Sequence, residues 1–590
     1  MGATVSSGNL FSPDRELVVR QLPLEQLVAA GWPGIDHDSY LVALQQAGEV
    51  IGKNIAPKGP ENDKLEFRIE RGRLVLPAAV EDYRQTIRDL GIPQLFISER
   101  YGGLEAPRSI MTAYAEMLWQ ADPGLAAGTL LTGGNGSLLQ TFGSEEVKQL
   151  FLPGIAAGRL SASMNLTEQT AGSDVWSLQT KAVPKEDGTA RLYGQKMFIS
   201  WPGDVQMVLA RDTDSQRISL YAVPLEIDGH RNDVDIIGIE RKLGLHSSPT
   251  CTIAYGEEGS GAIGFLVGER DRGLQHMFQM MNDARQQVAG QGIAMIEAAF
   301  QAAREYAQNR KQFGKPIAEF YLVQQMLADM NIHAQVLRAV VSEAVFASDL
   351  ATIFTRNGEL EKAAPYANLT AVLTPAIKYR ATEEGIRLAR SGVQIHGGYG
   401  YITDVDAERH LRNSVIATIY EGTSEIQVTS FLGEALLGMR GEGRANVNPV
   451  LQQMRRELSG TTYSHGLEEV KPIVLDAIDR IQHHDNLTQG ALPHLGMMYM
   501  EMMERHPELN PREVLNYVAP GAKPLANMVI DTYGAMLLMR QAQRERTGEK
   551  AISAQYFIQQ VLQPNLDRDE RQIGGLNSIT LELMRKVALL

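Results

Sequence analysis

The strongest single indication of how this chain folds is the stretch Ile419-Tyr420-Glu421-Gly422-Thr423-Ser424-Glu425-Ile426-Gln427. A carboxylate such as Glu421, when suitably held, can remove a proton next to a carbonyl group. Most glutamates are solvated surface residues, so a Glu-Gly pair by itself is weak evidence. Four other segments, which occur in a consistent order along the chain, support a functional interpretation of this one.

Size and composition set the outer limits. The chain has 590 residues, of which 44% are hydrophobic, as in a soluble protein of two to four domains. A net charge of −14 argues against a nucleic-acid partner, although local arginines can still bind an anionic ligand. The single cysteine, Cys251, excludes an intrachain disulfide and an all-cysteine metal site, and we expect no metal centre.

The same simple features suggest where the protein works. No run of about 18 apolar residues is present, so we expect no insertion into a membrane. The N-terminus lacks the basic start and apolar stretch of a signal peptide. Together with the low cysteine content, this predicts a reducing, cytoplasmic setting.

Hydrophobic periodicity changes twice along the chain. Residues 39–158 are mainly helical in pattern, and residues 159–270 alternate short Val, Ile, Leu and Tyr runs with Gly, Asp and Pro turns. Helical periodicity then returns. The predicted class is α+β, with these parts in order: an N-terminal extension (1–38), a helical domain (39–158), an antiparallel β domain (159–270), a helical bundle (271–440) and an extra helical module (447–590).

Two segments of the β region carry polar groups suited to a ring-shaped cofactor. The first, Met164–Asp174, contains hydroxyls and exposed backbone amides in a turn. The second, Gly194–Ser200, reads as a strand, and strict alternation would place Lys196, Phe198 and Ser200 on one face. Alone, the first is more simply an ordinary loop, and the second could equally be an ordinary core strand.

Two further segments lie in the helical bundle. Arg310-Lys311-Gln312-Phe313-Gly314-Lys315 ends a helix with an arginine, whose planar fork suits a pyrophosphate. Gln394-Ile395-His396-Gly397-Gly398-Tyr399-Gly400-Tyr401 contains paired glycines, which allow a backbone to approach a phosphate closely. Without context, each is more simply a solvated helix end or a turn.

Taken together, the five segments resemble those of the acyl-CoA dehydrogenase family, in its large bacterial form with a C-terminal helical extension. The loop is similar to T-E-P-x-A-G-S-D, with Gln169 in place of the proline, and Tyr420–Thr423 matches Y-E-G-T. A second family arrangement places the base on the helix that contains Arg285. The aligned residue is Ala284, which cannot serve as a base, so the resemblance favours Glu421.

The resemblance implies FAD as cofactor, an acyl-CoA thioester as substrate and Glu421 as catalytic base. It implies that Ser173, Arg285 and Tyr420 bind the substrate. The residues that it implies for FAD binding, some of them completing the site of a neighbouring subunit, are Met164, Leu166, Thr167, Ser173, Phe198, Ser200, Arg310, Phe313, Gln394, Gly397, Gly398, Thr423 and Glu425.

The implied reaction is α,β-dehydrogenation. Glu421 would take the α-proton while the β-hydride passes to flavin N5, giving a trans-2-enoyl-CoA. The electrons would go to an electron-transfer flavoprotein, and the assembly would be a homodimer or homotetramer. An oxidase that uses oxygen and a non-catalytic flavoprotein scaffold remain alternatives. The acyl group stays open between straight-chain, branched, aromatic and sulfur-containing types.

Overall fold

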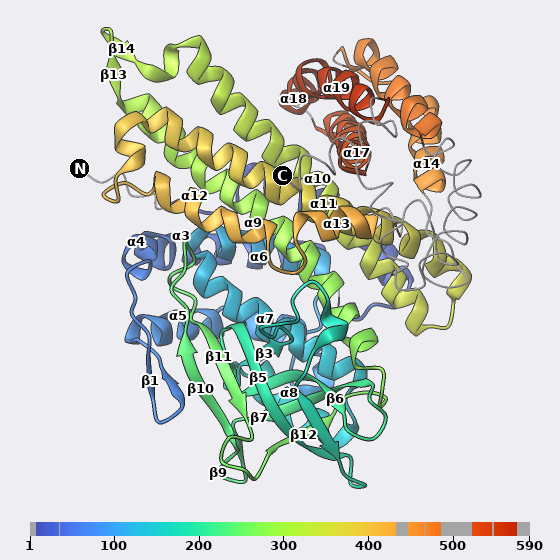
Figure 1. The fold of residues 1–590 in the computed structure, drawn as a ribbon. Coiled ribbons are helices and arrows are strands. Elements are labelled where there is room, and N and C mark those ends of the chain that lie inside the picture. The colour runs from blue at the N-terminus through green and yellow to red at the C-terminus, as the bar shows by residue number, and fades with distance from the viewer. Residues whose placement is uncertain are drawn as a thin grey trace, which may run out of the picture. The chain divides into compact units, whose positions relative to one another are not determined.

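A computed structural model gives the fold of residues 8–34, 36–431, 433, 447–464, 466–484, 522–545 and 548–574 (Figure 1). The expected boundary between 440 and 447 lies outside these residues. The chain divides into two compact units. The first unit takes in Met1–Ser12, Pro33–Val323 and Ala389–Ala417, and the second takes in Pro13–Trp32, Gln324–Leu388 and Thr418–Leu590.

The predicted β domain is confirmed as the centre of the first unit. Its eight strands are ordered β10-β11-β5-β12-β7-β6-β3, with β4 pairing both β5 and β6. Most pairs are antiparallel, as expected, but β3 and β4 each run parallel to β6. The strand bounds are β3 Ala162–Asn165, β4 Lys181–Pro184, β5 Thr189–Ser200, β6 Val205–Asp212, β7 Ile218–Pro224, β10 Val234–Ile239, β11 Thr250–Tyr255 and β12 Ala262–Leu266.

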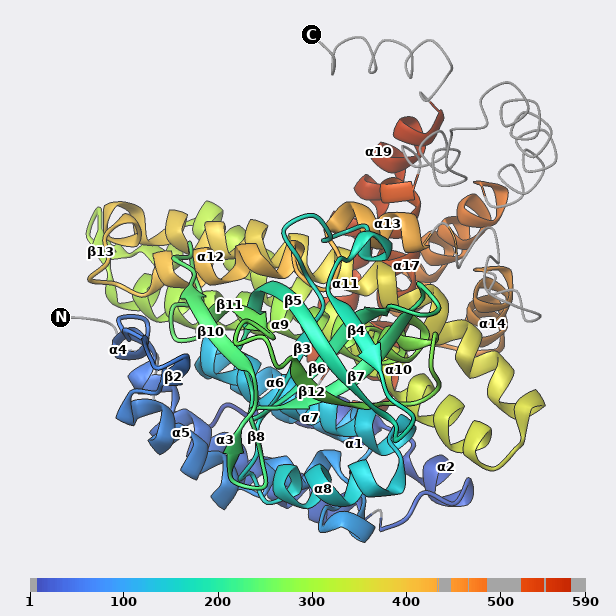
Figure 2. The same cartoon turned by 60° about the horizontal axis from the view of Figure 1, so that its bottom comes forward.

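Neighbouring helices explain the burial of this sheet. Every residue of β7 is buried, and all but one of β6, because these strands have cover on both faces. Helix α7 packs against β3 and α9 against β7 (Figure 2). Small hairpins complete the strand set: β1 Arg68–Glu70 with β2 Arg73–Val75, β8 Glu226–Ile227 with β9 His230–Arg231, and β13 Lys311–Gln312 with β14 Lys315–Pro316.

The helices of the first unit begin where the sequence supplies caps. Asp122 accepts hydrogen bonds from the amides of Gly124 and Leu125 at 3.1 Å each, and Pro123 takes the first helical position of α7. The helices are α3 His37–Asn54, α4 Gly59–Asn62, α5 Ala78–Asp89, α6 Arg108–Ala121, α7 Pro123–Phe142, α8 Glu145–Ala156, α9 Gly273–Asn309 and α12 Ala407–Val415.

The described residues of the second unit form helices and connecting loops. They include part of the helical bundle expected after the β region and the extra C-terminal helices. The helices are α1 Pro13–Gln21, α2 Leu24–Ala29, α10 Tyr321–Arg356, α11 Leu360–His396, α13 Ser424–Phe431, α14 Val447–Gly460, α17 Ala522–Arg544, α18 Glu549–Phe557 and α19 Gln563–Gly574. The first residues of α10 and the last turns of α11 belong to the first unit. None of the helices in the described ranges combines the length and apolar character that crossing a bilayer requires.

Buried charges tie the C-terminal helices to the rest of this unit. Arg380 of α11 donates to both carboxylate oxygens of Asp531 on α17, at 3.2 and 3.1 Å. Asp531 is 2% exposed and also accepts from Asn565 at 3.0 Å. On α18, Lys550 pairs with Asp14 of α1, which also binds Arg338 of α10. The N-terminal segment, expected as an extension, is therefore anchored by ion pairs.

Candidate active site

The loop that carries Glu421 lies in the second unit, directly before α13. The backbone φ of Glu421 is 55°, in the left-handed region that residues with side chains rarely adopt. Gln427 donates to the Glu421 carbonyl at 2.8 Å, and the Lys378 ammonium donates to the Gly422 carbonyl at 2.7 Å. Both donor residues are 0% exposed. Two buried donors therefore hold a strained backbone in place and fix where the Glu421 side chain starts.

Gly422 is required by the same geometry. Its φ is 91°, and a Cβ at this position would lie 2.6 Å from Nε2 of Gln427. Helix α13 therefore begins only at Ser424, because neither Glu421 nor Gly422 has right-handed helical backbone.

The first turn of α13 is held by side chains from two other helices. The Ser424 hydroxyl donates to Glu383 of α11 at 2.5 Å, and Thr423 Oγ1 accepts from the Ile426 amide at 3.3 Å. Lys523 of α17 donates to the exposed Glu425 carboxylate at 2.9 Å and lowers the pKa of that carboxyl. The extra C-terminal module therefore contacts the very segment that the sequence singled out.

The loop after β3, in the first unit, is anchored by a buried ion pair. Lys196 is 0% exposed and donates to Glu168 at 2.7 Å and to the Leu166 carbonyl at 3.1 Å. Burial lowers the pKa of Lys196 to about 8, and Glu168 opposes that shift. The Thr167 carbonyl accepts from the Met197 amide at 2.9 Å. These bonds set Leu166 and Thr167 beside strand β5.

Strand β5 contains a bulge that the sequence did not reveal. Lys196 pairs with Ile253 and Ile199 with Cys251, so three steps along β5 match two along β11. The prediction that Lys196 shares a face with Phe198 and Ser200 is therefore wrong. Lys196 and Ile199 are buried, whereas Phe198 is 56% exposed with a φ of 59°. The bulge places the Phe198 ring on the exposed side of β5, opposite to the buried side that strict alternation from Lys196 would give it.

Arg310 and the glycine pair come together elsewhere in the first unit. The Arg310 guanidinium lies 5.9 Å from the ring centroid of Tyr399, and Tyr306 stacks on His396 with centroids 4.4 Å apart. These residues line an open hollow of about 430 Å³. Its other lining residues are Gln312, Ile317, Ile395, Gly397, Gly398 and Ile402.

Backbone at the glycine pair is open to a ligand. A Cβ at Gly397 or Gly398 would have no atom within 4 Å, and Gln394 is exposed nearby. Phe313, at the tip of the β13–β14 hairpin, is 95% exposed with a φ of 53°. A guanidinium, an aromatic face and uncovered backbone form a chemically suitable place for a nucleotide.

Of the remaining predicted residues, Arg285 lies within α9, outside the segments described above, whereas Ser173, Met164 and Tyr420 belong to those segments. Arg285 of α9 is 6% exposed and donates to Asn282 at 3.0 Å. Its neighbour Asp283 pairs with Arg108 of α6 at 3.2 Å, and burial raises the pKa of Asp283. Ser173 is exposed in the loop after β3, which begins just beyond the partly exposed Met164, and Tyr420 is partly buried.

The structure thus brings the predicted residues together in three groups. Two belong to the first unit: the β3 loop with β5, and Arg310 with the glycine pair. The third, around Glu421, belongs to the second unit. Sequence reasoning missed Lys378, Glu383 and Lys523, since a lysine or glutamate in a helical pattern carries no local signal of a partner more than 40 residues away.

Comparison with known proteins shows which family this chain resembles in sequence. Three family models match: "Acyl-CoA dehydrogenase, N-terminal domain" at residues 46–159, "middle domain" at 163–256 and "C-terminal domain" at 271–436. The 3-methylmercaptopropionyl-CoA dehydrogenase of Ruegeria pomeroyi is 33% identical over 450 residues, which cover 72% of this chain and 75% of that protein.

Two solved structures share the fold over nearly the whole chain. Caenorhabditis elegans ACDH-11, in complex with C11-CoA, has a TM-score of 0.75 at 18% identity and covers 97% of this chain and 95% of its own. An acyl-CoA dehydrogenase from Bacillus anthracis, complexed with FAD, has a TM-score of 0.74 at 22% identity, with coverages of 97% and 94%. The extra C-terminal helices are therefore part of a fold seen before.

Proposed function

Because the chain belongs to the acyl-CoA dehydrogenase family of oxidoreductases, we propose that it catalyses FAD-dependent α,β-dehydrogenation of an acyl-CoA thioester with Glu421 as the base. The observation that carries this proposal is the strained Glu421 loop, held by two fully buried donors. Backbone strain kept in place by surrounding structure is typical of functional residues.

The residues of the first unit fit FAD. The outward-facing Phe198 ring offers a face for the flavin ring, with Ser200 and the anchored Leu166–Thr167 segment next to it on β5 and its neighbouring loop. Arg310 suits the pyrophosphate, and the uncovered Gly397–Gly398 backbone suits the adenosine end. When bound, FAD supplies the acceptor for the two electrons that leave the β-carbon.

The protein's own part in the reaction is to move one proton. An α-hydrogen of a thioester is too weak an acid for a free carboxylate, so the charge that develops on the thioester oxygen needs a hydrogen-bond donor. We assign the Glu421 backbone amide to this role. The carboxylate of Glu421 then removes the α-proton, and a neighbouring apolar acyl chain would raise its pKa and make it a better base.

Arg285, Ser173 and Tyr420 are proposed to hold the CoA-bearing substrate. Glu425 and Thr423 are proposed to help hold FAD, with Lys523 fixing the Glu425 carboxylate. The electron acceptor proposed is an electron-transfer flavoprotein, and the assembly a homodimer or homotetramer.

The test of this function is anaerobic titration of the purified protein with a panel of acyl-CoA thioesters. The panel contains straight-chain, branched and aromatic thioesters and 3-methylmercaptopropionyl-CoA, on which the Ruegeria pomeroyi relative acts by name. Loss of the flavin absorbance with one class supports the dehydrogenase and identifies its substrate. Absorbance that stays unchanged with every thioester contradicts it, and fast reoxidation of the reduced protein by oxygen would favour the oxidase.

Lys378→Met is expected to slow flavin reduction about 100-fold, because a small displacement of a catalytic group can cost that much. The variant leaves the Gly422 carbonyl without its ammonium donor, so the free energy of unfolding should also fall by about 1–3 kcal/mol. Stopped-flow reduction and urea unfolding measure the two effects. The matched control is Lys362→Met, an exposed lysine of the same helix.

A stability loss without a change in reduction rate would show that Lys378 is structural only. A positioning role also predicts that the reduction rate and FAD binding respond differently to the substitution. The rate of flavin reduction at saturating substrate should fall while FAD stays bound, since all the flavin contacts proposed above except Thr423 and Glu425 lie on other segments.

A further inference from the structure

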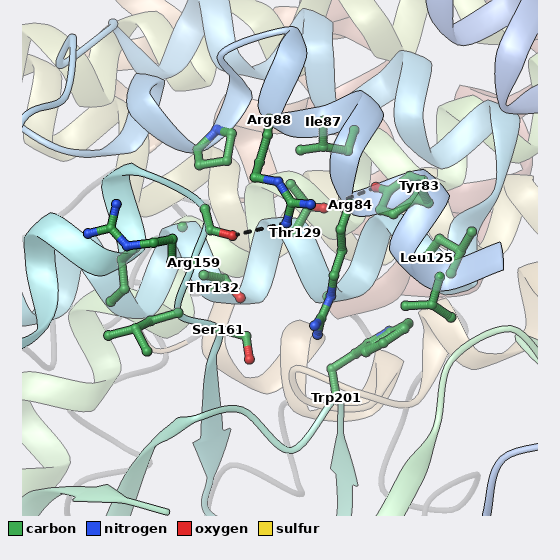
Figure 3. Close-up of a pocket in the computed structure, with 17 residues that line it drawn as sticks. Tyr83, Arg84, Ile87, Arg88, Leu125, Thr129, Thr132, Arg159, Ser161 and Trp201 are labelled. Carbon is green, nitrogen blue, oxygen red and sulfur yellow. Dashed lines mark hydrogen bonds between the residues drawn. The ribbon is translucent and has the colours of Figure 1, made fainter. Parts of the chain in front are cut away.

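A second cavity lies in the first unit, apart from all the residues assigned to FAD or substrate. It has a volume of about 70 Å³ and lies between α5, α7 and the residues that lead into β3 (Figure 3). Trp201, directly after β5, forms part of its wall. A space of this size has room for about five to seven water-sized groups.

Most of the cavity wall is apolar and well fixed. Val80, Ile87, Leu125 and Ile155 line it and are buried. The Trp201 indole donates from Nε1 to the Gly124 carbonyl at 2.7 Å. The ring lies so close to α7 that a Cβ at Gly128 would be 2.9 Å from it. A ligand body placed here would therefore meet a rigid apolar surface.

Three arginines line the cavity, and they differ in their partners or in the direction of the guanidinium. Arg88 donates to Glu81, Gln85 and the Gly158 carbonyl, so its guanidinium is already occupied. Figure 3 shows Arg84 extending from α5 toward Trp201, and its guanidinium carbon lies 5.9 Å from the Trp201 ring centroid. The guanidinium of Arg159 is directed to the opposite side in this view.

The side chains of Arg84 and Arg159 both lack a hydrogen bond and a carboxylate partner among the residues that the structure describes, but only Arg84 is directed toward the cavity, where its guanidinium contacts the Trp201 ring. The acidic residues beside Arg84 on α5 are engaged elsewhere, Glu81 with Arg88 and Asp82 with Lys58. On a chain with a net charge of −14, a guanidinium that faces a cavity without a carboxylate is suited to an external one.

We propose that this cavity binds a small organic carboxylate with a short apolar body. The carboxylate pairs with the Arg84 guanidinium, whose fork matches its two oxygens, and the body lies on Trp201 and the apolar wall. The size favours acids of about three to five carbons, one water-sized group per heavy atom. Inorganic phosphate is a poorer match, since a single guanidinium directed into the cavity and an apolar wall leave most of its oxygens without donors.

The binding test uses the full-length protein with its flavin bound. Pentanoate, the uncharged pentanamide and inorganic phosphate are titrated by calorimetry and by saturation-transfer NMR. Pentanoate should bind, and pentanamide and phosphate should bind at least about tenfold more weakly, the equivalent of one charge-assisted hydrogen bond. Equal binding of pentanoate and pentanamide, or no binding of pentanoate, would overturn the proposal.

Three variants locate the site. Arg84→Gln should weaken pentanoate binding at least about tenfold, and Arg84→Lys should weaken it less, because it keeps the charge but loses the fork. Arg159→Gln is the matched control and should leave the affinity near that of the wild type. The reverse pattern would refute the assignment to Arg84. Displacement of pentanoate by free coenzyme A would place it in the substrate site and also refute it.

Discussion

Glu421→Gln is expected to abolish reduction of the bound flavin by acyl-CoA while leaving FAD in place. Removing a general base typically lowers a rate by about 10²- to 10⁴-fold, and the glutamine cannot accept the α-proton. The substitution is nearly isosteric, and the backbone bonds from Lys378 and Gln427 involve carbonyl oxygens that the variant retains. Flavin absorbance during anaerobic mixing, with the FAD content of both proteins measured, tests this directly.

The matched control for this variant is Glu361→Gln. Glu361 is an exposed residue in the first turn of α11. Its replacement makes the same chemical change, glutamate to glutamine, away from the Glu421 loop. Reduction at the wild-type rate in Glu421→Gln would place the base elsewhere. The family's alternative position cannot then supply it, because Ala284 occupies that place.

The fold followed from periodicity, but its details did not. Alternating apolar runs in 159–270 indicated the β domain, and the helical runs on either side of it are confirmed. Strand order and the parallel pairing of β3 and β4 with β6 depend on contacts between distant segments, which a local pattern does not encode. The bulge in β5 is of the same kind, since it exists only relative to its partner β11.

For the candidate site too, the sequence predicted some features and not others. Motifs predicted which residues matter, because those residues are contiguous in the chain. The groups that hold them were not visible: Lys196 looked like a surface residue of a strand face, and Lys378 like one more helical lysine. Both are fully buried, and each is held by partners at least 28 residues away. The catalytic and binding roles themselves stay predictions until the variants are made.

Helix α11 connects the extra C-terminal module with the base loop. Along one stretch it carries Lys378, which bonds Gly422, then Arg380, which pairs with Asp531 of α17, then Glu383, which accepts from Ser424. A fixed α11 therefore fixes the loop on one side and binds the module on the other. We infer that the module stabilises the base loop through this helix and through the Lys523–Glu425 pair.

The buried charges of this region make stability depend on pH in the acid range and not near neutral pH. Burial would raise the pKa of Glu384, but Arg380, His333 and Arg387 together lower it to about 2. A carboxyl whose pKa falls on folding stabilises the folded state above its unfolded pKa of about 4.3. That contribution is lost as the pH falls from about 4.3 toward 2. At neutral pH Glu384 is therefore ionised beside Arg380 and Arg387, and removing a charged neighbour of this group leaves charge unbalanced.

Asp531→Ala is accordingly expected to lower the free energy of unfolding of the second unit by about 3–5 kcal/mol, the usual cost of removing one partner of a buried ion pair. It leaves the buried Arg380 with Glu384 alone and Asn565 without its acceptor. Urea unfolding followed by circular dichroism measures the loss. The matched control is Asp567→Ala, since Asp567 pairs with Arg480 at a partly exposed site and should cost at most about 1 kcal/mol.

A double variant, Arg380→Met with Asp531→Leu, separates the charge effect from packing. Apolar residues of similar volume can replace a buried ion pair with little loss, so the double variant should be more stable than Asp531→Ala. It should also recover flavin reduction if the pair acts only by fixing α11. If Asp531→Ala proves as stable as the Asp567→Ala control, then α17 is not held to α11 by this pair, and the proposed link from the C-terminal module to the base loop through α11 fails.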